Sequence, residues 1–293
     1  MKKWKHVFGI TATVFSVFTS AIASGAQLNI EVYNPGTKSL FPVSSEIISG
    51  KKEVVLIDAQ IQTNDAQALV EKIKKTEKKL TLVFISHKDP DFYFGLETIR
   101  NAFPDVKILA TPETVKAIKE SMDSKLAYWS PILKENAPKK VILPDVLDSD
   151  SFMVDDQKIE IKGLKTNPSD TYLWIPSLKT ALGGVIVYNN MHVWVADNQT
   201  PESRAKWFES IESIKNLNPI RVIPGHFLGS SNFGLKSLEF TEKYLKNFEM
   251  EAAKAKNSKE LISAMQKRYS KLTNKDDLEL SAKVIKGEMK WPQ

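Results

Sequence analysis

The chain has 293 residues, and its 41 Lys and Arg residues exceed its 35 Asp and Glu residues by a formal charge of +6. Three of these lysines lie in an N-terminal segment that we expect to be removed, so the remaining chain carries +3, too little to indicate a nucleic-acid partner. The chain has no cysteine, which excludes disulfide bonds and thiolate chemistry.

The N-terminal segment has the pattern of a secretory signal peptide. Three lysines among the first five residues precede an apolar run over 7–18, and small residues follow it. The small-x-small pattern places cleavage after Ala23 or after Ala26, and both positions remain open. The apolar run is shorter than the roughly 20 residues that span a bilayer. We therefore expect a periplasmic or secreted protein with no membrane contact after cleavage, beginning near residue 27.

Short β-branched segments alternate with helical patterns over the next two hundred residues, which is typical of an α/β (α+β) fold. We predict strands at 53–57, 80–85, 106–110, 141–143, 159–161, 172–175, 185–188, 193–195 and 220–223.

Amphipathic helices are expected between these strands. Residues 66–73 carry apolar side chains on one face, with Asn64 or Asp65 placed to cap the first turn. The segment 112–140 suggests a helix followed by a long connection, and another helix follows Pro201.

The last part of the chain has a helical pattern throughout. We divide the mature chain into a main domain over 27–234 and a helical extension over 235–293 that packs on it.

Polar side chains gather where two predicted strands end. His87, Asp89 and Asp91 alternate directly after the strand at 80–85, so an extended chain would project them to one side. His226 follows the strand at 220–223 in the sequence Pro-Gly-His, and His192 lies between two short strands. The ends of strands are where α/β proteins place their functional sites.

This arrangement resembles the metallo-β-lactamase superfamily over residues 28–230. The resemblance rests on LIDAQ after a strand, an amphipathic helix, a strand that ends in the histidine and aspartate loop, and a later PGH. It implies a four-layer αβ/βα sandwich, to which the helical pattern after residue 234 adds a C-terminal extension, and a site for one or two metal ions, usually zinc.

The chain departs from the family pattern H-x-H-x-D-H. Asp89 stands at the position of the second histidine and Phe92 at that of the last. A later histidine is replaced by Lys165 or Thr166, and Gly184 stands at the position of the aspartate that bridges two metals.

The resemblance therefore implies one metal, held by His87, Asp89, Asp91 and His226 and most simply zinc, with iron or manganese as alternatives and no metal if the site is inactive. Asp91 would orient or deprotonate the metal-bound water, as in the family, and His192 would protonate the leaving group. Asp58, in LIDAQ, is expected to hold the loop structurally.

Two functions follow from these expectations. The first is a periplasmic metallo-hydrolase that acts on a small ester, lactone or related substrate. The alternative is a non-catalytic member of the fold that binds a small ligand or a partner. The replacements at Phe92 and Gly184 favour the alternative, whereas the joint presence of His87, Asp91 and His226 favours the enzyme. The sequence does not indicate an oligomeric state.

Overall fold

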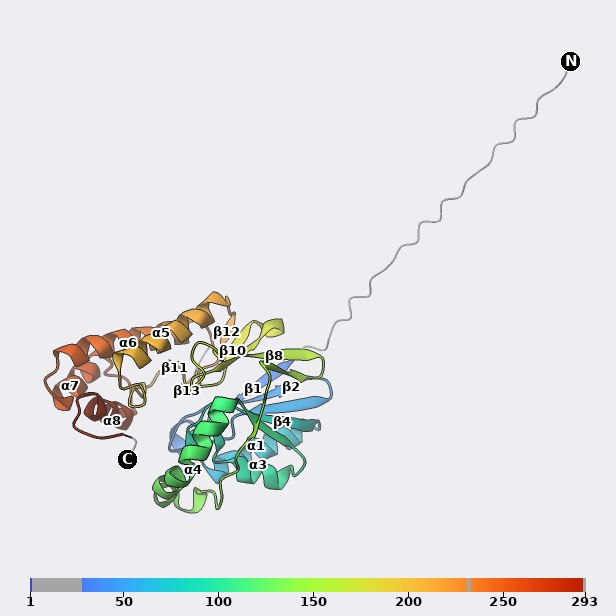
Figure 1. Cartoon of the computed structure of the whole chain (residues 1–293), viewed down its shortest axis with the longest axis horizontal. Helices are drawn as coiled ribbons and strands as arrows, with labels where there is room; N and C mark the ends of the chain where they lie inside the picture. Colours follow the sequence, from blue (N-terminus) through green and yellow to red (C-terminus); the bar gives the residue numbers. More distant parts are fainter. Residues whose placement is uncertain (2–27, 231–232, 292–293) are drawn as a thin grey trace.

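Two β-sheets face each other and carry helices on both outer sides (Figure 1). The computed structural model describes residues 1, 28–230 and 233–291, so the predicted signal peptide lies, apart from Met1, outside the described residues. The order of layers is helix, sheet, sheet, helix. The predicted four-layer αβ/βα sandwich is therefore confirmed.

The first sheet has six strands in the order β1-β2-β3-β4-β5-β6. The pairs β1–β2 and β2–β3 are antiparallel, whereas β3, β4, β5 and β6 run parallel to one another. The strands are β1 (Asn29–Tyr33), β2 (Ser45–Ser49), β3 (Glu53–Ile57), β4 (Lys79–Ile85), β5 (Lys107–Ala110) and β6 (Asp145–Val146).

The second sheet has five strands in the order β12-β10-β9-β8-β7, and β11 and β13 form a small parallel pair beside it. Its strands are β7 (Ser151–Val154), β8 (Gln157–Lys162), β9 (Tyr172–Ile175), β10 (Thr180–Leu182) and β12 (Arg221–Val222), and the small pair is β11 (Tyr188–Asn189) and β13 (His226–Phe227).

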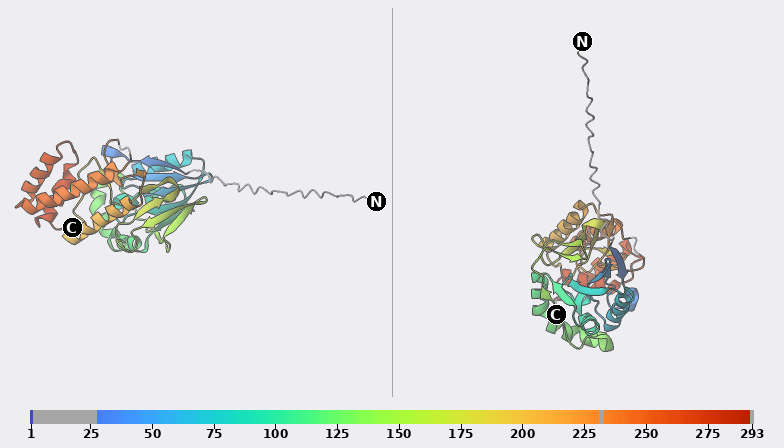
Figure 2. Two further views of the ribbon diagram at one scale, coloured as in Figure 1. Left: turned by 90° about the horizontal axis from the view of Figure 1, so that it is seen from above. Right: turned by 90° about the vertical axis from the view of Figure 1, so that its right-hand side faces the viewer.

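The helices divide between the two outer faces. The first sheet is covered by α1 (Thr63–Lys75), α2 (Pro90–Tyr93), α3 (Leu96–Ala102) and α4 (Pro112–Leu133), whereas α5 (Pro201–Asn216) and α6 (Lys236–Lys254) lie on the side of the second. With α7 (Ser258–Arg268) and α8 (Lys275–Ile285), α6 gathers at one end of the molecule (Figure 2). Short 3-10 turns occupy Gly36–Lys38, Lys134–Asn136 and Pro176–Leu178.

Three apolar cores hold the layers together. The central core lies between the sheets and includes Phe84 and Phe152, whose rings stack 5.2 Å apart. A second core fills the space under α1 and α3. The third joins the second sheet to the C-terminal helices, because Trp207 of α5 and Phe248 of α6 belong to the same buried cluster. The C-terminal helices are thus packed on the main domain.

Three predicted strands are wrong. No strand forms over 141–143, 185–187 or 193–195. Strand β11 begins only at Tyr188, and β6 begins two residues after the first of these segments. Their apolar side chains pack into the cores without forming a strand. The apolar pattern reports burial, and a β-strand also needs a neighbouring backbone to pair with.

The predicted cap of α1 is also wrong. Gln62 occupies the N-cap without a side-chain cap. Asn64 accepts a hydrogen bond from the Gln62 side chain and Asp65 accepts one from the Tyr33 hydroxyl, so both candidate caps are engaged elsewhere. Within residues 28–230 and 233–291, no helix is long and apolar enough to cross a bilayer.

Candidate functional site

The chain turns sharply after β4, at the edge where the predicted site residues lie. Pro90 begins the short helix α2, and Asp89, directly before it, has the extended backbone that a following proline favours. The expectation of an extended chain through Asp91 is therefore wrong. Because Asp91 lies in a helical turn, its side chain and that of Asp89 point to different neighbours.

His87 lies between two carboxylates, one at each ring nitrogen. Its Nδ1 atom is 3.3 Å from Oδ2 of Asp89, and its Nε2 atom is 3.3 Å from Oδ1 of Asp170. Burial opposes a charge on the ring, but the two carboxylates outweigh burial and raise the pKa of His87 to about 9. Lys125, on α4, lies 2.9 Å from the other oxygen of Asp89. This cluster of His87, Asp89, Lys125 and Asp170 is thus a network of ion pairs.

Asp91 and His226 form a second, separate pair. The Nε2 atom of His226 and Oδ2 of Asp91 are 2.8 Å apart, and both residues are buried. The ring of Tyr188 stacks on His226 at 4.9 Å with an interplanar angle of 8°. The parallel pairing of β11 with β13 sets this stack, because Tyr188 and His226 are directly opposite each other. The Nδ1 atom of His226 has no hydrogen-bond partner among the described residues.

Phe92 separates the two groups. Its ring contacts His87 edge to face at 5.3 Å and His226 at 5.6 Å. The side chain is buried, so an apolar ring fills the space between the two histidines. The structure brings all four predicted metal ligands to one sheet edge, yet it arranges them as two pairs.

Asp58 holds the start of the loop, as expected from the sequence. Its Oδ1 atom accepts a hydrogen bond from the Ser86 backbone N–H at 2.8 Å, and its Oδ2 atom accepts one from the Ser86 hydroxyl at 2.6 Å. The same hydroxyl accepts a hydrogen bond from the Gly184 N–H at 2.8 Å. Burial raises the pKa of Asp58 to about 7. Asp58 thus ties the loop after β3 to the loop after β4, and Ser86 continues the hydrogen bonds to Gly184, which follows β10 of the second sheet.

The position of the missing bridging aspartate has no room for a side chain. Gly184 has φ of +69°, and a Cβ atom built on it would lie 2.4 Å from the carbonyl oxygen of Thr171. The backbone of the neighbouring loop therefore closes the space that this ligand would occupy.

Lys165 and Thr166 are the residues that the sequence resemblance places where the family has a histidine. Both residues are exposed and line neither of the two cavities that flank the site. The turn folds back on Gly163, whose carbonyl accepts the N–H groups of Thr166 and Asn167. Asp170, four residues later, approaches His87 instead. Asp170 lies two residues before β9 begins at Tyr172, near the start of a strand and not after its end, so the pattern of carboxylates at strand ends did not single it out.

His192 does not lie at the mouth of either cavity, so the predicted position of a proton donor is wrong. Its ring is fully buried, and its Nδ1 atom is 2.9 Å from the Tyr244 hydroxyl of α6. Its backbone N–H donates to the side chain of Asn274. His192 therefore connects the main domain to the C-terminal helices.

We expect His192 to make the stability of the protein depend on pH. Burial, together with the charge of Lys275, lowers the pKa of His192 to about 4. Between pH 6.5 and 4 the unfolded chain binds a proton that the folded chain does not, so the free energy of unfolding falls as the pH falls, by about 3 kcal/mol in all. Urea unfolding at pH 7, 5.5 and 4 should show that the free energy of unfolding falls less with pH in His192→Gln than in the parent chain. Equal losses in the two proteins would contradict this.

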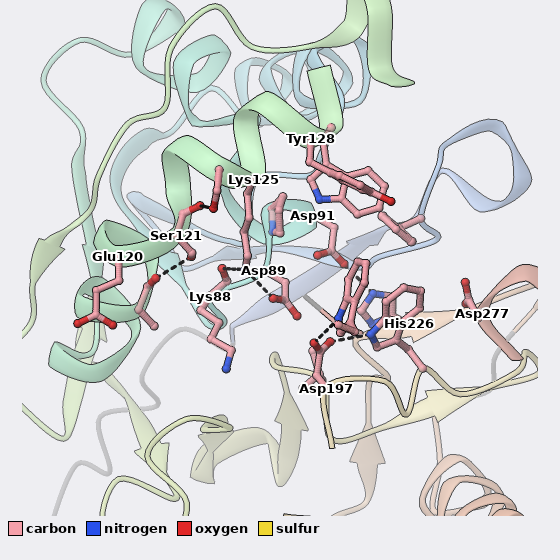
Figure 3. Close-up of a pocket in the computed structure, with 18 of the residues that line it drawn as sticks. Lys88, Asp89, Asp91, Glu120, Ser121, Lys125, Tyr128, Asp197, His226 and Asp277 are labelled. Atoms are coloured by element: carbon pink, nitrogen blue, oxygen red, sulfur yellow. Dashed lines mark hydrogen bonds and ion pairs between the residues drawn. The ribbon is translucent and has the colours of Figure 1, made fainter. Parts of the chain in front are cut away.

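Two adjoining cavities open over these side chains. One has a volume of about 420 Å³ and the other of about 340 Å³. The larger, whose lining is drawn in Figure 3, exposes Lys88, Asp91 and His226 together with aromatic side chains. The residues that line both cavities are Lys88, Asp89, Val185, Tyr188, Trp194 and Asp197, so the two spaces adjoin, and we refer to them together as the cleft.

Aromatic residues near the site fall into two groups. Phe92, Tyr93 and Phe94 are buried core side chains, and so are Trp174 and Trp207. Trp194 is half-buried and lines the cleft. Lys125, Asp197 and Trp291 also line the larger cavity, and nothing in the sequence pattern singled them out.

Comparisons with known proteins agree with this geometry. A family model described as the metallo-beta-lactamase superfamily matches residues 39–226. The chain belongs to this superfamily. Among curated proteins no significant sequence match is found.

Solved structures of superfamily members share the fold at low sequence identity. A metallo-beta-lactamase from Pontibacter korlensis is 18% identical with a TM-score of 0.55, covering 77% of this chain and 97% of its own. The metallo-beta-lactamase IND-7 is 19% identical with a TM-score of 0.53, covering 77% and 95%. These similarities establish the fold.

Superfamily members typically bind zinc, and the residues of this chain do not fit that ion. In the described part of the chain, no three His, Asp or Glu side chains are grouped so that they could hold a metal. Asp89 and Asp170 lie at different nitrogens of His87, so a cation on one nitrogen is reached by only one of the two carboxylates. The Lys125 ammonium already neutralises Asp89. The arrangement supports binding and ion pairing more directly than metal chemistry.

Proposed function

We propose that this superfamily member is a non-catalytic protein that binds a small molecule in the cleft over Asp91 and His226. The observation that carries the proposal is the contrast between the cleft and its floor. The cleft is open and lined by aromatic side chains. The side chains at its floor are joined in an ion-paired cluster around His87 and a hydrogen-bonded pair of Asp91 and His226, on either side of Phe92.

The chemistry of the cleft supports binding. Ligand sites are usually concave, largely apolar and supplied with a few polar groups that fix the orientation of the ligand. The larger cavity combines aromatic walls with Lys88, Lys125 and several carboxylates. The smaller cavity is lined mainly by polar residues, among them Asn167, Asn198 and Thr200. A ligand with an apolar body and a polar end matches the cleft.

Export to the periplasm is part of this proposal. The N-terminal sequence supports it, with its lysines, short apolar run and small residues.

A ligand screen tests the binding function. A compound that binds the folded protein at 100 times its dissociation constant stabilises it by about 2.7 kcal/mol, which should raise Tm by roughly 5 °C or more. We expect such compounds among small amphipathic molecules, and we expect Ala117→Phe, which fills the larger cavity from α4, to abolish the shift. Retained shifts in this variant would place binding elsewhere.

The second candidate function is the metal-dependent hydrolase that the superfamily resemblance implies. The 2.8 Å contact between Asp91 and His226 favours it, because both residues stand at family ligand positions and lie next to each other in the fold.

Metal analysis separates the two functions. We expect the mature protein, purified without chelator, to contain no more zinc, iron or manganese than the Asp91→Ala and His226→Ala variants. Asp105→Ala, a change of an exposed carboxylate outside the cleft, serves as the matched control. One metal ion per chain in the parent and in the control, lost in both site variants, would establish the hydrolase candidate instead.

A further inference from the structure

Five aromatic side chains form a closed ring of contacts at the larger cavity. Phe41 contacts Trp129 at 5.3 Å and Trp194 at 6.2 Å, Trp194 contacts Trp291 at 5.4 Å, Trp291 contacts Tyr128 at 6.2 Å, and Tyr128 contacts Trp129 at 4.9 Å. All of these contacts are edge to face, and all five side chains line the cavity. Because neighbouring rings meet edge to face, some of the five rings turn a face, and others an edge, toward the cavity.

A carboxylate closes one side of this aromatic ring. Each oxygen of Asp197 accepts a hydrogen bond from an indole N–H, one from Trp194 at 2.6 Å and one from Trp291 at 2.8 Å, as Figure 3 shows for the labelled Asp197. Indole is a neutral donor, so these bonds orient the carboxylate without neutralising it. Among the described residues, Asp197 has no ion-pair partner within 4 Å, and it lies where the two cavities meet.

The other charges of the cavity leave an excess of negative charge. Lys125 is engaged with Asp89, and His226 with Asp91. Glu120 and Asp277 also line the cavity, and of the described lysines that line it, Lys125 pairs with Asp89 whereas Lys88 has no carboxylate within 4 Å. Burial raises the pKa of Asp277 to about 7, so a nearby positive charge would favour its ionised form.

We propose that the aromatic ring and Asp197 bind a small organic cation, an ammonium group on a compact apolar body. The proposal rests on the ligand-binding function proposed above and names its ligand class. Aromatic faces attract a cation through their quadrupole, and the attraction is strongest for tryptophan. A metal ion does not match these walls, because the Tyr128 hydroxyl is the one possible ligand atom that the five aromatic side chains supply, whereas an organic ammonium carries an apolar body that packs against the ring faces.

Three probes with the same carbon skeleton test the ligand class. 4-Phenylbutylamine is a cation, 4-phenylbutan-1-ol is neutral and 4-phenylbutanoate is an anion at pH 7. Binding to the full mature chain is followed by tryptophan fluorescence and by calorimetry. We expect the amine to bind about 10-fold more tightly than the alcohol, as one cation–π and ion-pair contact of moderate strength predicts.

Charge-neutralising variants test the role of Asp197. We expect Asp197→Asn to lower the affinity for the amine by about 10-fold and to change the affinity for the alcohol by no more than about 2-fold. Glu120→Gln, a change at an exposed position on α4, should lower the affinity for the amine by about 2-fold and leave the structure of the protein unchanged. Asp145→Asn, an exposed carboxylate of β6 outside the cavity, is the matched control and should change neither affinity.

The outcomes separate this inference from the function on which it rests. If the alcohol or the acid binds as tightly as the amine, or if Asp197→Asn leaves amine binding unchanged, the organic-cation class is wrong and the ligand-binding function stands. If none of the three probes binds in a saturable way, both proposals are overturned.

Discussion

Gly184→Asp, which restores a carboxylate at the family's bridging position, should destabilise the fold and recruit no metal. We expect the free energy of unfolding to fall by about 4 kcal/mol, of which about 1 kcal/mol reflects the left-handed backbone and the rest the overlap with Thr171. The Cβ atom would lie 2.4 Å from a backbone oxygen, and a backbone group cannot rotate away as a flexible side chain can. Urea unfolding and metal analysis measure the two effects.

Gly36→Asp is the matched control for this change. Gly36 has φ of +60°, close to that of Gly184, and a Cβ atom at this position would have no heavy atom within 4 Å. We expect a loss of about 1 kcal/mol from the backbone conformation alone. Similar losses in both variants would show that the neighbouring loop yields easily, and that the site can still accept the family ligand.

Asp58→Ala should be nearly as damaging, although the residue contacts no cavity. Removing the carboxylate leaves the Ser86 N–H and hydroxyl without their acceptor in a buried position, and it loosens the chain of hydrogen bonds that runs on to Gly184. We expect the free energy of unfolding to fall by about 3 kcal/mol. Chemical unfolding at pH 7 gives this value directly.

Asp58→Asn separates the loss of hydrogen bonds from the loss of charge. The amide keeps an acceptor for the Ser86 N–H, so we expect a loss of about 1 kcal/mol. Asp105→Ala, at an exposed position, should change stability by less than about 0.5 kcal/mol. The structural role of Asp58 would be refuted by a loss in Asp58→Ala no greater than that of the exposed control.

The sequence predicts helices and strands best where the hydrophobic periodicity agrees with the turn-forming residues that bound the element. The helix α1, the strands β3, β4, β8 and β9, and the helical C-terminal region all lie close to their predicted positions. It fails at 185–187 and 193–195, because the apolar residues there pack into the cores without pairing with a neighbouring strand, and β11 begins only at Tyr188. It also missed β1 and β2, whose antiparallel pairing with β3 extends the first sheet.

The candidate site was predictable in its place and not in its arrangement. His87, Asp91 and His226 lie at one sheet edge, as the strand ends indicate. Their division into two pairs depends on Phe92, whose position between the histidines follows from the helical turn that begins at Pro90.

By itself the sequence determined the layer order, the family and the loss of particular ligands, because these depend on the order of elements and on residue types along the chain. Only the tertiary structure decided which groups meet. Asp170 reaches His87 across the two sheets, and the aromatic ring joins Phe41 of the first loop, the α4 pair of Tyr128 and Trp129, Trp194 and the C-terminal Trp291. Contacts between residues so distant in the chain have no local pattern, since packing of whole layers brings them together.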